Sequence, residues 1–77
     1  MKTMRTPQAE IMEFLAALGE RIRQERLKRG FDFMQAYRLT GISPTSWARM
    51  ESGQYLNIAK IMLALRIFGL TLKVEEL

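Results

Sequence analysis

The chemistry open to this chain comes from its hydroxyl groups, its cations and its carboxylates, because it contains neither histidine nor cysteine. Without these two residue types it has no ordinary general base near pH 7 and no thiolate or imidazole ligand for zinc. Its eight acidic residues form no recognisable pair for acid–base work. The residue types therefore indicate a protein that binds rather than one that catalyses, and we expect no metal and no cofactor.

The charge of the chain favours a polyanionic partner. Its 77 residues suffice for one small domain, with 12 lysines and arginines against 8 acids, a net charge of +4 and a pI near 10. Nucleic acid is the first candidate for such a domain, and the alternative is a basic protein with no such partner. No apolar run approaches the ~18 residues of a membrane helix, and the start of the chain lacks a signal-peptide core. We expect a cytoplasmic protein with no membrane contact.

The first predicted helix begins at Thr6 and Pro7, an N-cap followed by a proline that suits the first helical position. Apolar residues then recur every three or four positions on one helical face: Ile11, Leu15, Leu18 and Ile22. Gly19 interrupts this stripe at a cost of about 1 kcal/mol relative to alanine. The pattern leaves open whether residues 7–29 form one bent helix or two, and Gly30 is the predicted stop.

Three further helices are predicted from residues that suit helix ends. Good N-cap residues stand before residues 33–40, 44–52 and 58–68: Asp32, Ser43 and Asn57. A glycine follows each of these segments: Gly41, Gly53 and Gly69. The chain is therefore expected to be all-α, with four to five helices.

The last segment changes period and predicts a short C-terminal strand. Leu70, Leu72 and Val74 alternate with polar residues, which is typical of a half-buried strand. A lone strand has unpaired backbone groups, and no other segment of the chain reads as a strand. The simplest partner is the same strand of a second copy, so we expect a homodimer with these three residues in the interface. The N-terminal helix, through Met12 and Phe14, is a further candidate for that interface.

Two short helices joined through Gly41-Ile42-Ser43 make a helix-turn-helix pattern, because the turn needs a left-handed residue. The chain resembles the lambda-repressor-like, Cro/XRE-type helix-turn-helix family. The resemblance covers residues 18–69 and rests on these residues, in this order: Leu18-Gly19, Ile22, Arg26, Gly30, Gly41-Ile42-Ser43, Trp47 and Arg49-Met50-Glu51, followed by Gly53. It implies a DNA-binding domain over 18–69, which leaves an N-terminal helical extension over 1–17 and the predicted dimerisation strand over 70–77.

The resemblance also implies roles for single residues. The positions that face the bases of double-stranded DNA in the family correspond here to Pro44, Thr45, Ser46 and Arg49. An arginine can pair bidentately with guanine, and a threonine can hydrogen-bond a base or touch a thymine methyl. Ser43 and Ser46 suit phosphate contacts. Arg26 and Glu51 correspond to a structural ion pair of the family.

Three features leave the interpretation open. Phe33 stands where the family has a phosphate-binding glutamine, and Pro44 has no polar side chain, so DNA binding is in doubt at both positions. Tyr55 lies where a phosphate backbone would pass, but it also suits anchoring of the fourth helix. The cations of the first helix suit either a solvated face or phosphate contacts: Arg21, Arg23, Lys28 and Arg29.

A transcriptional regulator that reads an operator is the function that these observations favour. The alternative is a protein-interaction module with the same fold, such as the antitoxin partner of a toxin. The strand-like tail is similar to that of HipB-type antitoxins, which also bind DNA.

Overall fold

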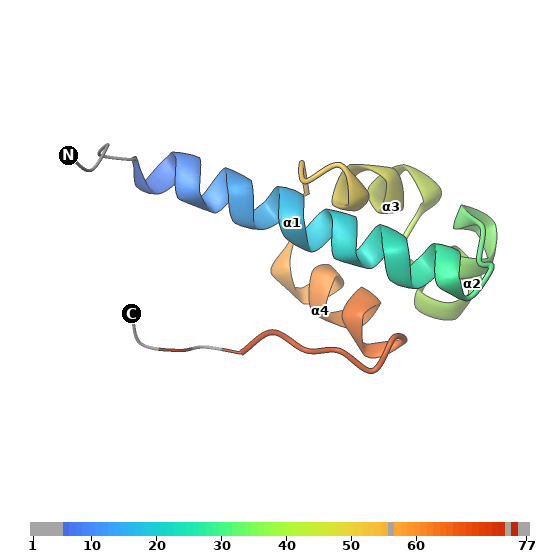
Figure 1. Ribbon diagram of the computed structural model, residues 1–77. Coiled ribbons are helices and arrows are strands. Elements are labelled where there is room, and N and C mark those ends of the chain that lie inside the picture. Colours follow the sequence, from blue (N-terminus) through green and yellow to red (C-terminus); the bar gives the residue numbers. More distant parts are fainter. Residues whose placement is uncertain (1–5, 56, 74, 76–77) are drawn as a thin grey trace.

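The computed structural model describes residues 6–55, 57–73 and 75, and within them the chain forms four helices (Figure 1). They are α1 (Pro7–Lys28), α2 (Phe33–Thr40), α3 (Pro44–Glu51) and α4 (Ile58–Arg66). α1 runs the length of the molecule, with α3 on one side of it, α4 on the other and α2 near its C-terminal end (Figure 1). The predicted all-α bundle is confirmed for this part of the chain.

Each helix begins at the cap residue that the sequence indicated. The four cap side chains accept hydrogen bonds from backbone N–H groups in the first turns: Thr6 from Ala9 at 3.1 Å, Asp32 from Gln35 at 2.7 Å, Ser43 from Ser46 at 3.2 Å and Asn57 from Lys60 at 3.1 Å. The Gln35 side chain also accepts from the backbone N–H of Asp32 at 2.8 Å, which completes a capping box. Local side chains therefore set where the helices start.

α1 is one continuous helix through Gly19, which settles the alternative that the sequence left open. The helix also passes without a break from the predicted N-terminal extension into the predicted domain. A Cβ atom on Gly19 would collide with the backbone oxygen of Met50 and would lie 2.7 Å from that of Glu51. The glycine therefore lets the end of α3 approach the α1 backbone. It is required for this close packing and does not mark a bend in the helix.

The core lies where α1, α2, α3 and α4 meet. Nine buried apolar residues form it: Ile22, Ala36, Ile42, Trp47, Met50, Ile61, Ala64, Leu65 and Phe68. Trp47 is fully buried and meets Phe68 edge-on, with ring centroids 6.3 Å apart. This single cluster holds α3 through its inner face, so that its outer face stays free.

The predicted C-terminal strand is wrong for the described residues 70–73 and 75, which form an irregular segment. The backbone N–H of Leu70 donates to the carbonyl of Leu65 at 2.9 Å, and Leu70 and Leu72 pack half-buried against the core of their own chain. The alternating apolar residues thus find their cover without a paired strand. Val74, the third predicted interface residue, lies outside the described residues.

Candidate nucleic-acid interface

The turn between α2 and α3 is held by backbone conformation and by one hydroxyl group. Gly41 has a φ of +76°, a left-handed conformation that favours glycine. The Thr40 hydroxyl accepts from the backbone N–H of Ile42 at 3.1 Å and from the indole N–H of Trp47 at 3.3 Å. The same hydroxyl donates to the carbonyl of Ala36 at 2.7 Å. Thr40 therefore joins the end of α2, the turn and the buried side of α3.

α3 has one buried face and one exposed face. Trp47 and Met50 point into the core. Because successive residues are about 100° apart around a helix, the opposite side carries positions spaced by three, four and seven. These residues are all exposed: Thr45, Ala48, Arg49 and Ser52, the last being the C-cap residue. We call them the outer face of α3.

The residues predicted to face DNA divide into two groups. Thr45 and Arg49 lie on the outer face of α3, whereas Pro44 and Ser46 are half-buried at its edges. Ser43 is exposed and occupied as the N-cap, and its hydroxyl donates to the Ser46 hydroxyl oxygen at 2.9 Å. Ser43, Pro44, Thr45 and Ser46 thus lie at the N-terminal end of α3 and Arg49 lies in its last turn. Of the five, only Thr45 and Arg49 lie on the outer face.

Sequence reasoning missed Ala48 and Ser52, the other two members of the outer face. Their helical spacing from Thr45 was the signal that could have found them. Ala48 carries no polar group, and Ser52 stood next to the predicted helix stop. Ser52 donates from its hydroxyl to the carbonyl of Arg49 at 2.9 Å, which places it beside the last turn of α3.

Arg49 differs from the cations of α1 in its surroundings. Within the described residues, Arg49 takes part in no ion pair, whereas the exposed cations of α1 lie beside acids of the same helix. These contacts are Arg21 to Glu25 at 2.8 Å, Arg23 to Glu20 at 3.7 Å, Lys28 to Glu25 at 3.8 Å and Arg29 to Glu25 at 2.7 Å. The structure therefore favours the solvated-face interpretation for the α1 cations.

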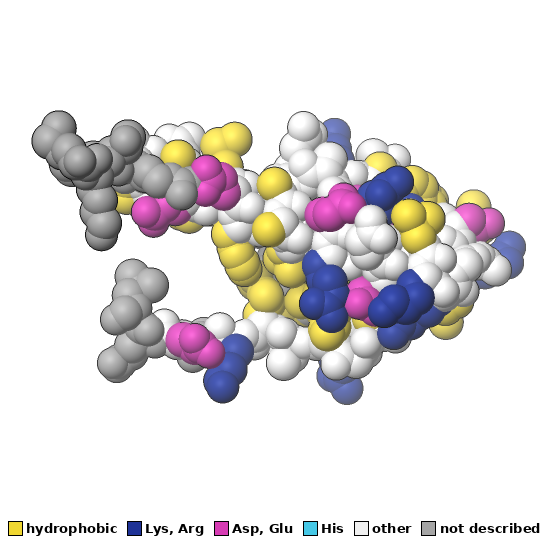
Figure 2. Space-filling model, viewed as in Figure 1, with side chains coloured by type: hydrophobic (Ala, Val, Ile, Leu, Met, Phe, Trp, Pro, Cys, Tyr) yellow, Lys and Arg dark blue, Asp and Glu magenta, His cyan; other side chains and the backbone are white. Residues whose placement is uncertain are grey.

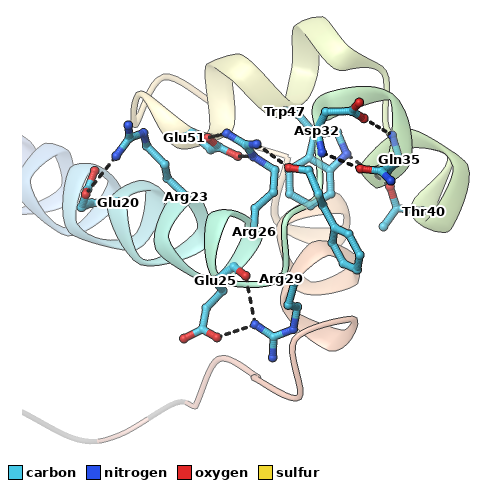
Figure 3. A network of polar contacts seen from close by, with 11 residues as sticks. Glu20, Arg23, Glu25, Arg26, Arg29, Asp32, Gln35, Thr40, Trp47 and Glu51 are labelled. Atoms are coloured by element: carbon cyan, nitrogen blue, oxygen red, sulfur yellow. Dashed lines mark hydrogen bonds and ion pairs between the residues drawn. The ribbon is translucent and has the colours of Figure 1, made fainter.

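Glu25 is the centre of the charge network on α1. Its carboxylate accepts hydrogen bonds from Arg29 and Arg21, and these bonds lower its pKa to about 2, although burial acts in the opposite direction. Arg29 also donates to the Glu25 carbonyl at 3.0 Å (Figure 3). It donates further to the Phe68 carbonyl at 3.4 Å, and its guanidinium lies over the Phe68 ring. The network ties the end of α1 to the residues that follow α4.

Arg26 on α1 faces Glu51, the last residue of α3 (Figure 3). Two hydrogen bonds of 2.6 and 3.0 Å join the guanidinium of Arg26 to the two carboxylate oxygens of Glu51. A third bond of 2.7 Å runs from Arg26 to the carbonyl of Phe31. The two side chains are 11% and 6% exposed, so the pair is largely shielded from water. It fixes α3 against α1.

Phe33 and Tyr55 serve the packing of the domain. The guanidinium carbon of Arg26 lies 4.3 Å from the centroid of the Phe33 ring, and Phe33 also packs against the core. Phe33 therefore covers the buried ion pair at the position where the resemblance implies a phosphate contact. Tyr55 is half-buried against the same core, which favours its role as an anchor for the segment before α4.

Comparison with known proteins places this geometry in a family. A family model described as a helix-turn-helix domain matches residues 17–76 of the 77-residue chain, and the chain belongs to this family. No curated protein and no solved structure was found to match it. The family is of a DNA-binding type and is not typically enzymatic, so the chain is in general terms a DNA-binding regulator. The outer face of α3 is then its candidate nucleic-acid interface.

None of the helices in the described ranges combines the length and apolar character needed to cross a bilayer. In those same ranges, no cluster of three or more histidines, cysteines, aspartates or glutamates is arranged to hold a metal ion.

Proposed function

We propose that the protein regulates transcription by binding a specific sequence of double-stranded DNA, with α3 in the major groove. The observation that carries this proposal is the outer face of α3, where Arg49 is exposed and makes no ion pair within the described residues. A free guanidinium on an exposed helix face is available for a DNA base, whereas a paired one would first have to leave its partner.

The outer face of α3 offers complementary chemistry for base edges. Arg49 can donate two parallel hydrogen bonds to guanine O6 and N7, the commonest specific contact in the major groove. Thr45 supplies a hydroxyl that hydrogen-bonds any base. Ala48 supplies a methyl group that can touch the methyl group of thymine. These three side chains lie within about one and a half turns of α3 and would read adjacent base pairs.

Phosphate contacts would come from the N-terminal end of the same helix. The Ser46 oxygen accepts the hydrogen bond from Ser43, so its own hydroxyl hydrogen is available to a phosphate oxygen. The N-terminal end of a helix also carries a partial positive charge that favours anions. Pro44 at the first helical position donates no backbone hydrogen bond. We therefore expect Ser46, rather than Pro44, to fix the register of α3 on the duplex.

We further propose that the chain lies within the lambda-repressor-like, Cro/XRE-type branch of helix-turn-helix proteins. The bidentate contact between Arg26 and Glu51 supports this, since the resemblance implies an ion pair at these two positions. The close approach of α3 to α1 at Gly19 also supports it.

Selection from a pool of random duplexes tests the proposed function. The expected result is enrichment of a consensus sequence, whose affinity exceeds that for unrelated duplex by a factor of about 10³ or more. The affinity should fall steeply with salt, because phosphate contacts release counterions from the DNA. Absence of any consensus, or an affinity that does not change with salt, would contradict specific DNA binding.

A further inference from the structure

The N-terminal half of α1 carries an apolar stripe that its own chain does not cover. Ile11 and Phe14 are 58% and 49% exposed, whereas Ile22 on the same stripe is fully buried in the core. The first turns of residues 7–17, which we call the α1 overhang, extend beyond the body of the domain (Figure 1). The apolar stripe therefore extends along α1 beyond the part that packs in the core. Such a stripe stabilises a helix only when it packs against another surface.

The apolar surface continues from the α1 overhang onto neighbouring parts of the chain. Figure 2 shows hydrophobic side chains in the hollow between the α1 overhang and the C-terminal segment. Ile58 and Met62 are 57% and 41% exposed on α4, whose first turn lies at the base of the overhang (Figure 1). Apolar side chains on both α1 and α4 are thus left exposed.

The size of this surface fits a protein partner. With roughly 200 Å² for a large apolar side chain, the exposed fractions of Ile11, Phe14, Ile58 and Met62 give an apolar area on the order of 400 Å². Protein interfaces are about 60% apolar, so this area corresponds to about 700 Å² in total per partner. Stable complexes bury about 800 Å² per partner.

The charges of α1 favour another copy of this chain as the partner. The α1 overhang has two acids and no cation, with Lys2 and Arg5 preceding it outside the described residues, whereas residues 18–77 have ten cations and six acids. Glu10, Phe14 and Arg21 lie on one side of α1, since steps of four and seven residues return to nearly the same helical face. When two α1 helices run antiparallel across a two-fold axis, Glu10 of each lies opposite Arg21 of the other, with the Phe14 side chains between them.

The same face of α1 leaves the DNA interface free. Gly19 contacts the end of α3, and Ala16 lies against Gly53 in the loop that follows α3. By helical position, these contacts are about 180° around α1 from the side that carries Phe14 and Arg21. Self-association on that side would leave the outer face of α3 exposed on both copies.

We propose that the protein is a symmetric dimer in which two α1 helices pack antiparallel through Ile11, Phe14 and Leu18. Glu10 pairs with Arg21 of the other copy through the guanidinium NH2 groups of Arg21, because the bond to Glu25 uses only its Nε–H. Ile58 and Met62 border the contact. This interface replaces the strand-paired dimer that the sequence predicted. It does not depend on DNA binding, so it stands or falls separately from the proposed function.

Sedimentation velocity of the full chain across the micromolar range, without DNA, tests the apolar part of the interface. We expect the wild type to be a dimer. Phe14→Gln should weaken dimerisation by about tenfold or more, because it removes a large apolar side chain from the contact. Met12→Gln is the matched control, since Met12 is 62% exposed on the same helix but lies on the side of Gly19. A monomeric wild type, or equal effects of the two variants, would overturn the proposal.

A charge exchange tests the antiparallel register. Glu10→Lys and Arg21→Glu should each weaken the dimer, because each places like charges opposite one another. The double variant should restore dimerisation, since the pair then forms with its signs reversed. A double variant as weak as the single ones would overturn the register, provided that circular dichroism shows it folded. A monomeric wild type that instead binds an unrelated chain, such as a toxin, would assign the surface to that partner.

Discussion

Arg26 of α1 and Glu51 of α3 are joined by two hydrogen bonds in a bidentate ion pair, and a third bond holds Arg26 to the carbonyl of Phe31. The pair links the helix that spans the molecule to the end of the helix that presents Arg49. Fixing α3 against α1 at this point sets the direction in which its outer face points. Stability and the candidate interface are therefore coupled through these two side chains.

Removing one member of this pair should lower the free energy of unfolding more than removing both. Glu51→Ala leaves Arg26 charged in a site that is only 11% exposed, and loss of one partner of a buried pair costs about 3–5 kcal/mol. The double change Arg26→Met, Glu51→Leu should cost less, because it leaves no buried charge. Urea unfolding followed by the fluorescence of the single tryptophan, Trp47, measures both.

Glu20→Ala is the control for this comparison. Its contact with Arg23 is 3.7 Å long between side chains that are 57% and 48% exposed, so its loss should cost no more than about 1 kcal/mol. Equal stability of Glu51→Ala and the wild type would show that the ion pair does not hold α3 in place.

Gly19→Ala should destabilise the protein, although alanine is the better helix former. Helix propensity alone would stabilise the variant by about 1 kcal/mol. A Cβ atom at this position would meet backbone oxygens of Met50 and Glu51, which cannot rotate away, and such overpacking costs about 1–3 kcal/mol. Ala17→Gly, at an exposed site in the same helix, should show the ordinary propensity effect. An increase in the melting temperature of Gly19→Ala would show that α3 does not approach α1 closely.

The folded protein should become less stable at low pH because Glu25 is then protonated. Its pKa is about 2 in the folded protein, against about 4.3 for a free glutamate, because Arg29 and Arg21 donate hydrogen bonds to the charged form. The stabilisation is complete above pH ~4.3 and is lost as the pH falls towards 2. Glu25→Gln should thus show a smaller drop in melting temperature between neutral and acidic pH than the wild type.

Glu20→Gln, which removes an exposed carboxylate from the same helix, serves as the control for Glu25 and should keep most of the wild-type pH dependence. A Glu25→Gln variant whose melting temperature falls with pH as steeply as that of the wild type would refute the role of this network.

The sequence predicted those features that depend on neighbouring residues. Asp32, Ser43 and Asn57 act within their own helix turns, so their roles as caps could be predicted without knowing the fold. The reason for Gly19 could not be found in this way, because the atoms that exclude a side chain belong to α3. The sequence pattern alone therefore could not decide whether residues 7–29 form one helix or two.

The misassigned strand shows a second limit of sequence patterns. Leu70 and Leu72 alternate with polar residues, as in a half-buried strand, but an irregular segment that lies on its own core produces the same alternation. For the candidate interface, the resemblance identified Thr45 and Arg49 by position. It did not reveal Ala48, because a methyl group shows its value only when the exposed side of α3 is known.

Arg49→Ala, measured against the selected duplex by fluorescence anisotropy, tests the central claim that the outer face of α3 reads DNA. Arg66→Ala is the matched control, because Arg66 is exposed at the end of α4, on the other side of α1 from α3, and it too has no ion pair within the described residues. We predict that Arg49→Ala loses about 1–3 kcal/mol of specific affinity and relaxes the preference at one base pair, while Arg66→Ala retains that preference. A folded Arg49→Ala variant that binds the duplex with wild-type affinity and sequence preference would contradict the claim.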